Sequence, residues 1–147
     1  MKIDKVILAS NNNSQYLDFW PLVSEAWKRI NVEPILIYTG KEKIDLPGNI
    51  INFYVEGLDP VFVAQNIRIL APALFPNDNS ITADIDDLPL SKSYFIDNVK
   101  NVPEHMFVVS FPILVGQLVF VVSAALLTCS ILFLKVSIYP HNCCILS

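Results

Sequence analysis

The chain has 147 residues, a formal net charge of −4 and a sequence pI near 5.0. This length suits a single domain whose core is large enough to fold without disulfides. The acidic balance, with no cluster of lysine and arginine, argues against a nucleic-acid-binding surface, and no nucleic-acid partner is expected.

Two parts of the chain differ in composition. All acidic residues and every basic residue except Lys135 precede Met106, whereas all three cysteines follow it. We therefore expect a domain over residues 1–109 and an apolar tail over residues 110–147.

The first half of the domain begins with a short apolar run, residues 5–9, rich in β-branched side chains, which predicts a strand. The polar residues 10–14 predict a loop. A helix is expected next, with Pro21 in its first turn. Its apolar residues recur at three- and four-residue spacing: Tyr16, Phe19, Trp20, Val23, Trp27 and Ile30.

The same alternation continues to the acidic cluster. Strands are expected over residues 34–38 and 49–55, and a helix runs from an Asp59 cap and Pro60 to Phe75, shortened by Pro72. After a turn at residues 76–80, a fourth strand covers residues 81–85. This order predicts an α/β fold with a mostly parallel sheet and flanking helices.

Three aspartates, Asp84, Asp86 and Asp87, end that fourth strand. Strand alternation puts Asp84 and Asp86 on one face, about 6.6 Å apart, at the sheet edge where ligands bind in open α/β folds. Two such carboxylates repel unless a cation lies near them, and Mg²⁺ accepts one or two carboxylates together with phosphate oxygens. The plainer alternative is that the aspartates end the strand and cap the next turn.

The stretch "QNIRILAPALFPNDNSITADIDDLPLSKSYF", residues 65–95, resembles the donor-binding half of a GT-A glycosyltransferase. The resemblance covers about residues 2–109 and implies a GT-A-like (Rossmann-like) fold. It implies that Asp86 binds a divalent ion, Mn²⁺ or Mg²⁺, directly, while Asp84 contacts the donor ribose or a metal-bound water. The ion would stabilise the departing nucleoside diphosphate.

The resemblance also implies two partners, a sugar donor and a glycan or protein acceptor of unknown identity. The donor would be a nucleotide sugar, in the first instance a UDP-sugar. Arg68 would face the phosphates or the sugar, and Gln65 shares its helix stripe; both would otherwise be solvated helix residues. The nucleobase and ribose would meet the loop formed by Ala9, Ser10, Asn11 and Asn12, which would otherwise be an ordinary turn and helix cap.

The likeness to the family ends near Ser110, and neither His105 nor His141 stands in the family's late metal-binding motif. The alternative function is therefore a non-catalytic, membrane-tethered or truncated relative of a glycosyltransferase. A haloacid-dehalogenase-like phosphatase also uses Asp-x-Asp, but it expects a hydroxyl side chain where this chain has Leu88.

The tail has no charged residue from Met106 to Leu134. As a helix, residues 113–134 would span about 33 Å, enough to cross a membrane, and the protein would then be membrane-associated rather than cytoplasmic. A buried strand pair or a core helix is the alternative. The last four residues, 144–147, match a prenylation pattern that would be redundant after a spanning helix.

Overall fold

The computed structural model describes residues 1–103, 106–113 and 116–123. The chain forms two units, Met1–Glu104 and His105–Ser147, and each is described by itself. The second unit begins before residue 110, because its first strand already starts at Met106.

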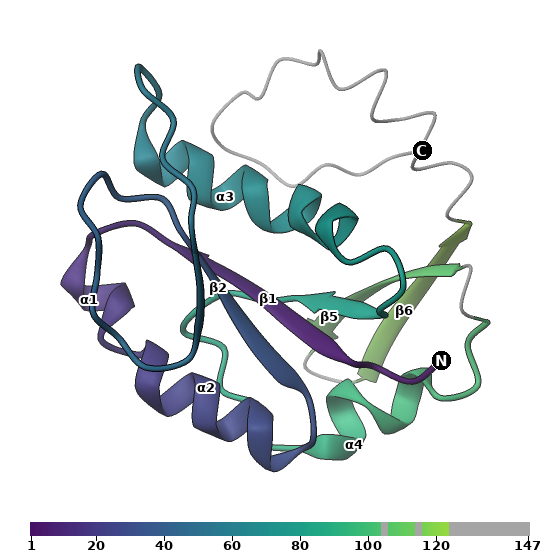
Figure 1. Ribbon diagram of the computed structural model, residues 1–147. Helices are drawn as coiled ribbons and strands as arrows, with labels where there is room; N and C mark the ends of the chain where they lie inside the picture. The colour runs from purple at the N-terminus through teal and green to yellow at the C-terminus, as the bar shows by residue number, and fades with distance from the viewer. Residues whose placement is uncertain (104–105, 114–115, 124–147) are drawn as a thin grey trace. The chain divides into compact units, whose positions relative to one another are not determined.

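The first unit is built on a four-stranded sheet in which every pair of neighbours is parallel (Figure 1). The strand order is β3-β2-β1-β4, with bounds β1 Lys5–Ser10, β2 Glu33–Tyr38, β3 Asn49–Asn52 and β4 Ser80–Thr82. This is the order of the first four strands in doubly wound folds, whose ligands bind where the order reverses. The α/β fold with a parallel sheet and flanking helices, predicted from the sequence, is confirmed.

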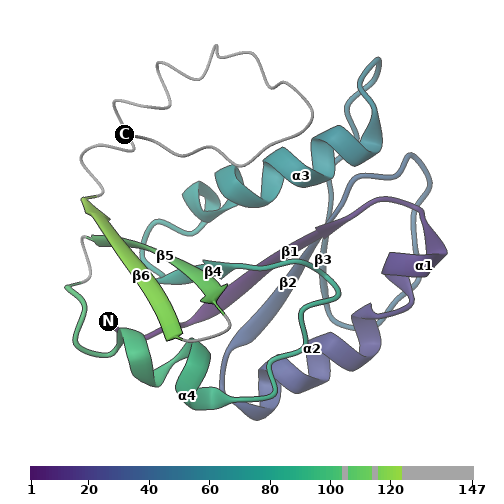
Figure 2. The same cartoon turned by 180° about the vertical axis from the view of Figure 1, so that it is seen from behind.

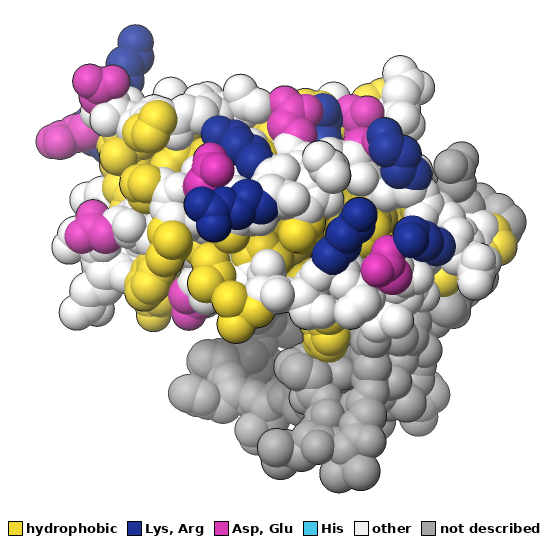
Figure 3. Space-filling model, turned by 90° about the horizontal axis from the view of Figure 1, so that it is seen from below, with side chains coloured by type: hydrophobic (Ala, Val, Ile, Leu, Met, Phe, Trp, Pro, Cys, Tyr) yellow, Lys and Arg dark blue, Asp and Glu magenta, His cyan; other side chains and the backbone are white. Residues whose placement is uncertain are grey.

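Helices cover both faces of this sheet. α2 (Trp20–Arg29) and α4 (Lys92–Phe95) lie on one face and α3 (Pro60–Leu70) on the other, as the two opposite views show (Figures 1 and 2). The short helices are α1 (Ser14–Leu17) and the 3-10 turns η1 (Ala71–Leu74) and η2 (Asp97–Val99). Seen from the α2 and α4 side, the surface mixes hydrophobic side chains with charges of both signs (Figure 3).

The alternation of β1 builds two cores. Val6 and Leu8 pack with the indoles of Trp20 and Trp27 on the α2 side. Ile7 and Ala9 point to the opposite face and pack with residues of β2, α3 and η1. A strand that is apolar on both faces belongs in the middle of a helix-covered parallel sheet, so the apolar run at residues 5–9 is explained by its position.

Two predicted helices differ from the observed ones because of proline. The helix expected to follow the first loop is broken at Asp18–Phe19 into α1 and α2, since Pro21 has no N–H to donate and fits only in a first turn, here that of α2. Pro72 has the same effect on α3, whose helical path continues past Leu70 only as the 3-10 turn η1. The predicted Asp59 cap is confirmed, with its carboxylate accepting the Val61 N–H at 2.9 Å.

Two predicted strands are too long. β3 ends at Asn52 rather than at Val55, and β4 ends at Thr82 rather than at Ile85. One further backbone bond, from Ala83 N–H to the Ile7 carbonyl at 3.1 Å, extends the β1–β4 pairing. The chain then turns, because the Asp87 N–H donates to the Asp84 carbonyl at 3.1 Å. Aspartate favours such turns, and the acidic cluster therefore lies in a turn after the strand and not within it.

The second unit contains an antiparallel pair, β5 (Met106–Ile113) and β6 (Gly116–Ser123), in register from Met106–Ser123 to Ile113–Gly116. The predicted continuous helix over residues 113–134 is therefore wrong for residues 116–123. Both segments are rich in valine and phenylalanine, which favour strands. Among the residues that the structure describes, none of the helices combines the length and apolar character needed to cross a bilayer. Residues 124–134, His141 and the prenylation pattern lie outside the described residues.

Candidate functional site

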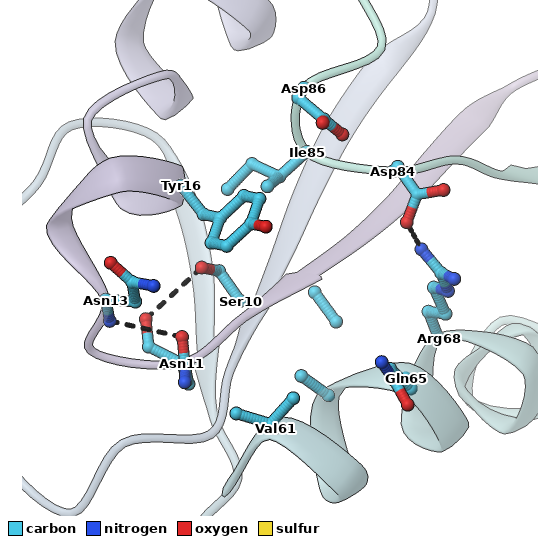
Figure 4. A pocket seen from close by; sticks show the side chains of 12 residues that line it. Ser10, Asn11, Asn13, Tyr16, Val61, Gln65, Arg68, Asp84, Ile85 and Asp86 are labelled. Atoms are coloured by element: carbon cyan, nitrogen blue, oxygen red, sulfur yellow. Dashed lines mark hydrogen bonds and ion pairs between the residues drawn. The ribbon is translucent and has the colours of Figure 1, made fainter. Parts of the chain in front are cut away.

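A cavity of about 300 Å³ lies at the carboxyl ends of β1 and β4, next to α3 (Figure 4). β1 and β4 are the neighbours between which the strand order reverses, since β2 and β3 lie on one side of β1 and β4 on the other, and this is the expected position for a ligand in this type of fold. The cavity is lined by Ala9, Ser10, Asn11, Asn13, Tyr16, Val61, Ala64, Gln65, Arg68, Asp84, Ile85 and Asp86. Its size falls at the lower end of the range of small-molecule sites.

The loop after β1 supplies the polar wall. Ser10 donates its hydroxyl to the Asn11 carbonyl at 3.2 Å, and the Asn11 side-chain oxygen accepts the Asn13 N–H at 3.1 Å. The Asn13 side-chain oxygen caps α1 by accepting the Gln15 N–H at 3.0 Å. Among the described residues, these contacts use only the oxygens of the two amides, so both NH₂ groups remain donors at the cavity.

The loop residues predicted for the nucleobase and ribose are not all placed alike. Ala9, Ser10 and Asn11 line the cavity. Asn12 is exposed and does not line it, whereas Asn13, which the sequence did not single out, does. The reason is the turn closed by Asn11 and Asn13, in which the residue between them projects away from the wall.

The acidic turn supplies the opposite wall. Ala83 and Ile85 are buried in the α2-side core, whereas Asp84 and Asp86 are exposed and line the cavity. The predicted separation into an apolar and an acidic face is confirmed, although the backbone is a turn there. The buried Ile85 holds the turn, so that one carboxylate stands on each side of it (Figure 4).

Arg68 connects α3 with this turn. Its guanidinium forms an ion pair with the Asp84 carboxylate, and the two side chains are 26% and 59% exposed. Gln65, three residues earlier on α3, lines the same wall. Burial lowers the pKa of Arg68 from its ordinary value, against the opposing effect of the Asp87 and Asp86 charges. Arginine nevertheless stays charged in proteins.

The remaining carboxylates are less well compensated. Burial, and then the charge of Asp86, raise the pKa of Asp87 above its ordinary value, and Arg68 only partly offsets them. Asp86 forms no ion pair and no side-chain hydrogen bond with the part of the chain that the structure describes. The turn thus carries more negative charge than the single guanidinium neutralises.

This donor set fits a divalent cation that is shared with a ligand. Within the described residues, no group of three or more histidine, cysteine, aspartate or glutamate side chains is arranged to hold a metal ion. Two carboxylates, Asp84 and Asp86, do line one cavity, and Mg²⁺ is commonly bound by one or two carboxylates while water and phosphate oxygens complete its shell. The arrangement therefore suits an ion that arrives with a phosphate ligand better than a closed structural metal site.

Tyr16 is the main lining residue that the sequence reasoning missed. Its ring is 47% exposed and stands over the cavity between the Ser10 and Asp86 walls (Figure 4). Its spacing from Trp20 and Trp27 suggested a core position. The position of Pro21 was the available signal, because a break before it releases Tyr16 from the buried stripe of α2.

The chain was compared with protein-family models, with curated proteins and with solved structures, and none of the three comparisons found a match.

Proposed function

We propose that residues 1–104 bind a nucleotide-diphosphate sugar, in the first instance a UDP-sugar, together with Mn²⁺ or Mg²⁺. In its full form the proposal is a GT-A-type glycosyltransferase that transfers the sugar to a glycan or protein acceptor. One observation carries it: a single cavity at the reversal of strand order gathers amide donors, an aromatic ring, a guanidinium and two carboxylates.

Each group suits one part of such a ligand. The NH₂ groups of Asn11 and Asn13 suit the carbonyl oxygens of a uracil-like base, and the Tyr16 ring offers a surface on which a base can stack. Arg68 suits the diphosphate, because a guanidinium binds phosphate oxygens through two parallel hydrogen bonds.

Asp86 and Asp84 would hold the cation against the diphosphate. When bound, a divalent ion there stabilises the negative charge of a departing nucleoside diphosphate. The chain's own residues orient the donor: the loop after β1 fixes one end, and α3 and the acidic turn fix the other.

The composition of the cavity also supports a second function, binding of the nucleotide sugar without transfer. The residues that line the cavity include no histidine, and their carboxylates are those assigned to the cation. A domain that binds the nucleotide sugar without transferring it would need nothing more than this cavity.

Calorimetric titration of the purified full-length chain tests the proposal. UDP and UDP-glucose are each titrated with Mn²⁺ and with a chelator, and UMP serves as the control that lacks the second phosphate. We expect binding of UDP that requires Mn²⁺ and is much weaker for UMP. A folded chain that binds neither UDP nor UDP-glucose would overturn the proposal. Release of UDP from UDP-glucose would then separate the enzyme from the non-catalytic binder.

A further inference from the structure

The ion pair between Arg68 and Asp84 occupies part of the cavity wall itself. Asp84 is one of the two carboxylates that line the cavity, so a cation bound by both Asp84 and Asp86 would share the Asp84 carboxylate with the guanidinium, which contacts one of its two oxygens. A guanidinium and a divalent ion on the same carboxylate would also repel each other. The guanidinium and the cation should therefore weaken each other's binding to Asp84.

The two carboxylates of the cavity differ in this respect. Asp84 points toward Arg68, whereas Asp86 lies on the other side of the buried Ile85 (Figure 4). Asp86 has no ion-pair partner within the described part of the chain, so it can accept a cation without losing a contact. We therefore expect a cation to bind Asp86 first and then to displace Arg68 from Asp84.

Displacement would leave the guanidinium beside the cavity without its carboxylate. Arg68 is only 26% exposed and stands on a helix whose Gln65 and Val61 line the same cavity, so its head group has little room except toward the ligand. A phosphate oxygen is the partner that such a group binds best.

We propose that Arg68 and a divalent cation compete for Asp84, and that cation binding releases the guanidinium to bind the diphosphate. This inference rests on the proposed function and deepens it, because it makes the binding of cation and diphosphate cooperative. Each ligand then raises the affinity of the other by the same factor. Arg68 binds the diphosphate directly, and its release from Asp84 couples the two ligands.

The test measures Mn²⁺ affinity of the full-length chain by electron paramagnetic resonance of free Mn²⁺, first with no nucleotide. We expect Arg68→Gln to tighten Mn²⁺ binding by about two- to fivefold, the effect of removing a half-exposed competing ion pair. Asp84→Asn should weaken it. In the Asp84→Asn background the Arg68→Gln change should have a smaller effect, because the competition at Asp84 has been removed and only the charge of Arg68 near Asp86 and Asp87 remains.

The second measurement repeats the Mn²⁺ titration with saturating UDP. UDP should tighten Mn²⁺ binding in the wild type, and Arg68→Gln should reduce this enhancement. Arg29→Gln is the matched control: Arg29 also pairs with a carboxylate, that of Glu25, but lies on α2 outside the cavity lining. Thermal unfolding of each variant verifies that the fold is retained.

Three results would overturn the inference. Mn²⁺ affinity that Arg68→Gln leaves unchanged or weakens would exclude competition while leaving the proposed function standing. Equal tightening in the Asp84→Asn background would show that Arg68 acts only through its long-range charge. A wild-type chain that binds UDP without Mn²⁺ would overturn both the inference and the metal part of the proposed function, and a chain that binds neither would overturn both entirely.

Discussion

The two ends of the parallel sheet both carry charged side chains, but they compensate those charges differently. At the amino end, Lys5 is 16% exposed and bonds both Glu33, at 2.5 Å, and Asp78, at 3.4 Å, while Asp4 pairs with Lys2. At the carboxyl end, Arg68 pairs with Asp84 alone, and Asp86 has no such partner among the described residues.

The difference separates a structural role from a binding role. The acidic groups of the amino end have their cation within the domain, and Glu33 is satisfied further by the Asn49 amide at 2.7 Å. The carboxyl end keeps excess negative charge around a cavity, which costs stability unless a cation from outside binds there. Substitutions at the carboxyl end should therefore weaken ligand binding without lowering stability, and substitutions at the amino end should lower stability without weakening ligand binding.

The largest expected effect is that of Asp86→Asn on binding. Loss of the uncompensated carboxylate should weaken Mn²⁺-dependent UDP binding by about 100-fold or more, because a charged ligand to the cation is removed. The free energy of unfolding should not fall. Calorimetry and urea denaturation measure the two quantities, with Asp45→Asn, exposed and outside the cavity lining, as the control. Unchanged UDP binding by the Asp86 variant would remove the metal role from the acidic turn.

Lys5→Met, at the amino end, should lower stability and leave ligand binding unchanged. It leaves Glu33 and Asp78, whose side chains are 47% and 34% exposed, without their shared cation, and we expect a loss of about 1 kcal/mol or less in the free energy of unfolding because solvent screens both carboxylates. UDP affinity should be unchanged. Urea denaturation of this variant and of Lys28→Met, an exposed lysine of α2, provides the comparison. A large loss of UDP affinity with an intact fold would contradict the division between the two ends.

Tyr16→Ala should weaken UDP binding by about fivefold, near the lower limit for loss of a stacking surface, because the ring is partly exposed. Tyr16→Phe should retain the affinity, since the ring and not the hydroxyl supplies the surface. Phe19→Ala removes a comparably exposed ring that does not line the cavity. If both alanine variants weakened binding equally, Tyr16 would have no specific role.

The smallest effect concerns Asp87 and pH. Its pKa is raised in the folded chain, so the folded state holds this proton more tightly than the unfolded state, and the stability from this group is lost as pH rises through the folded-state pKa. Asp87→Asn cannot ionise and should be more stable than the wild type at pH 7, by well under about 1 kcal/mol because solvent screens the site. The two proteins should converge near pH 3. A variant that is less stable at pH 7 would show that the attraction between the charges of Asp87 and Arg68 dominates.

The sequence predicted the centre of the sheet well and its edges poorly. The apolar runs of β1 and β2 are explained by burial on both faces, so composition alone located them. The alternation of residues 81–86 continued past the end of β4, because Ala83 and Ile85 are buried even where strand hydrogen bonds stop. The alternation of apolar and acidic residues therefore predicted correctly which side chains are buried, but it predicted a strand that is too long.

The segments that line the site could be predicted from the sequence, whereas the contacts between those segments could not. The aspartates and the polar loop were visible as local patterns, and both contribute to the cavity lining, although Asn12, Ser14 and Asp87 do not line it. The pairing of Arg68 with Asp84 joins α3 to the acidic turn across the end of the sheet, and no local pattern encodes it. Likewise, the exposure of Tyr16 depended on where a helix breaks, which spacing alone does not determine.

The pairing of β4 with β1 has a consequence for the order in which the site forms during folding. The backbone N–H of Asn79 bonds the Asp4 carboxylate 75 residues earlier, and Ser80 lies opposite Lys5 in the ladder. Such distant contacts close a long loop and tend to form late, after the more local β1–β2 pairing. The two walls of the cavity therefore meet only when the last strand has docked, and an intermediate can contain most of the hydrophobic core while having no binding site.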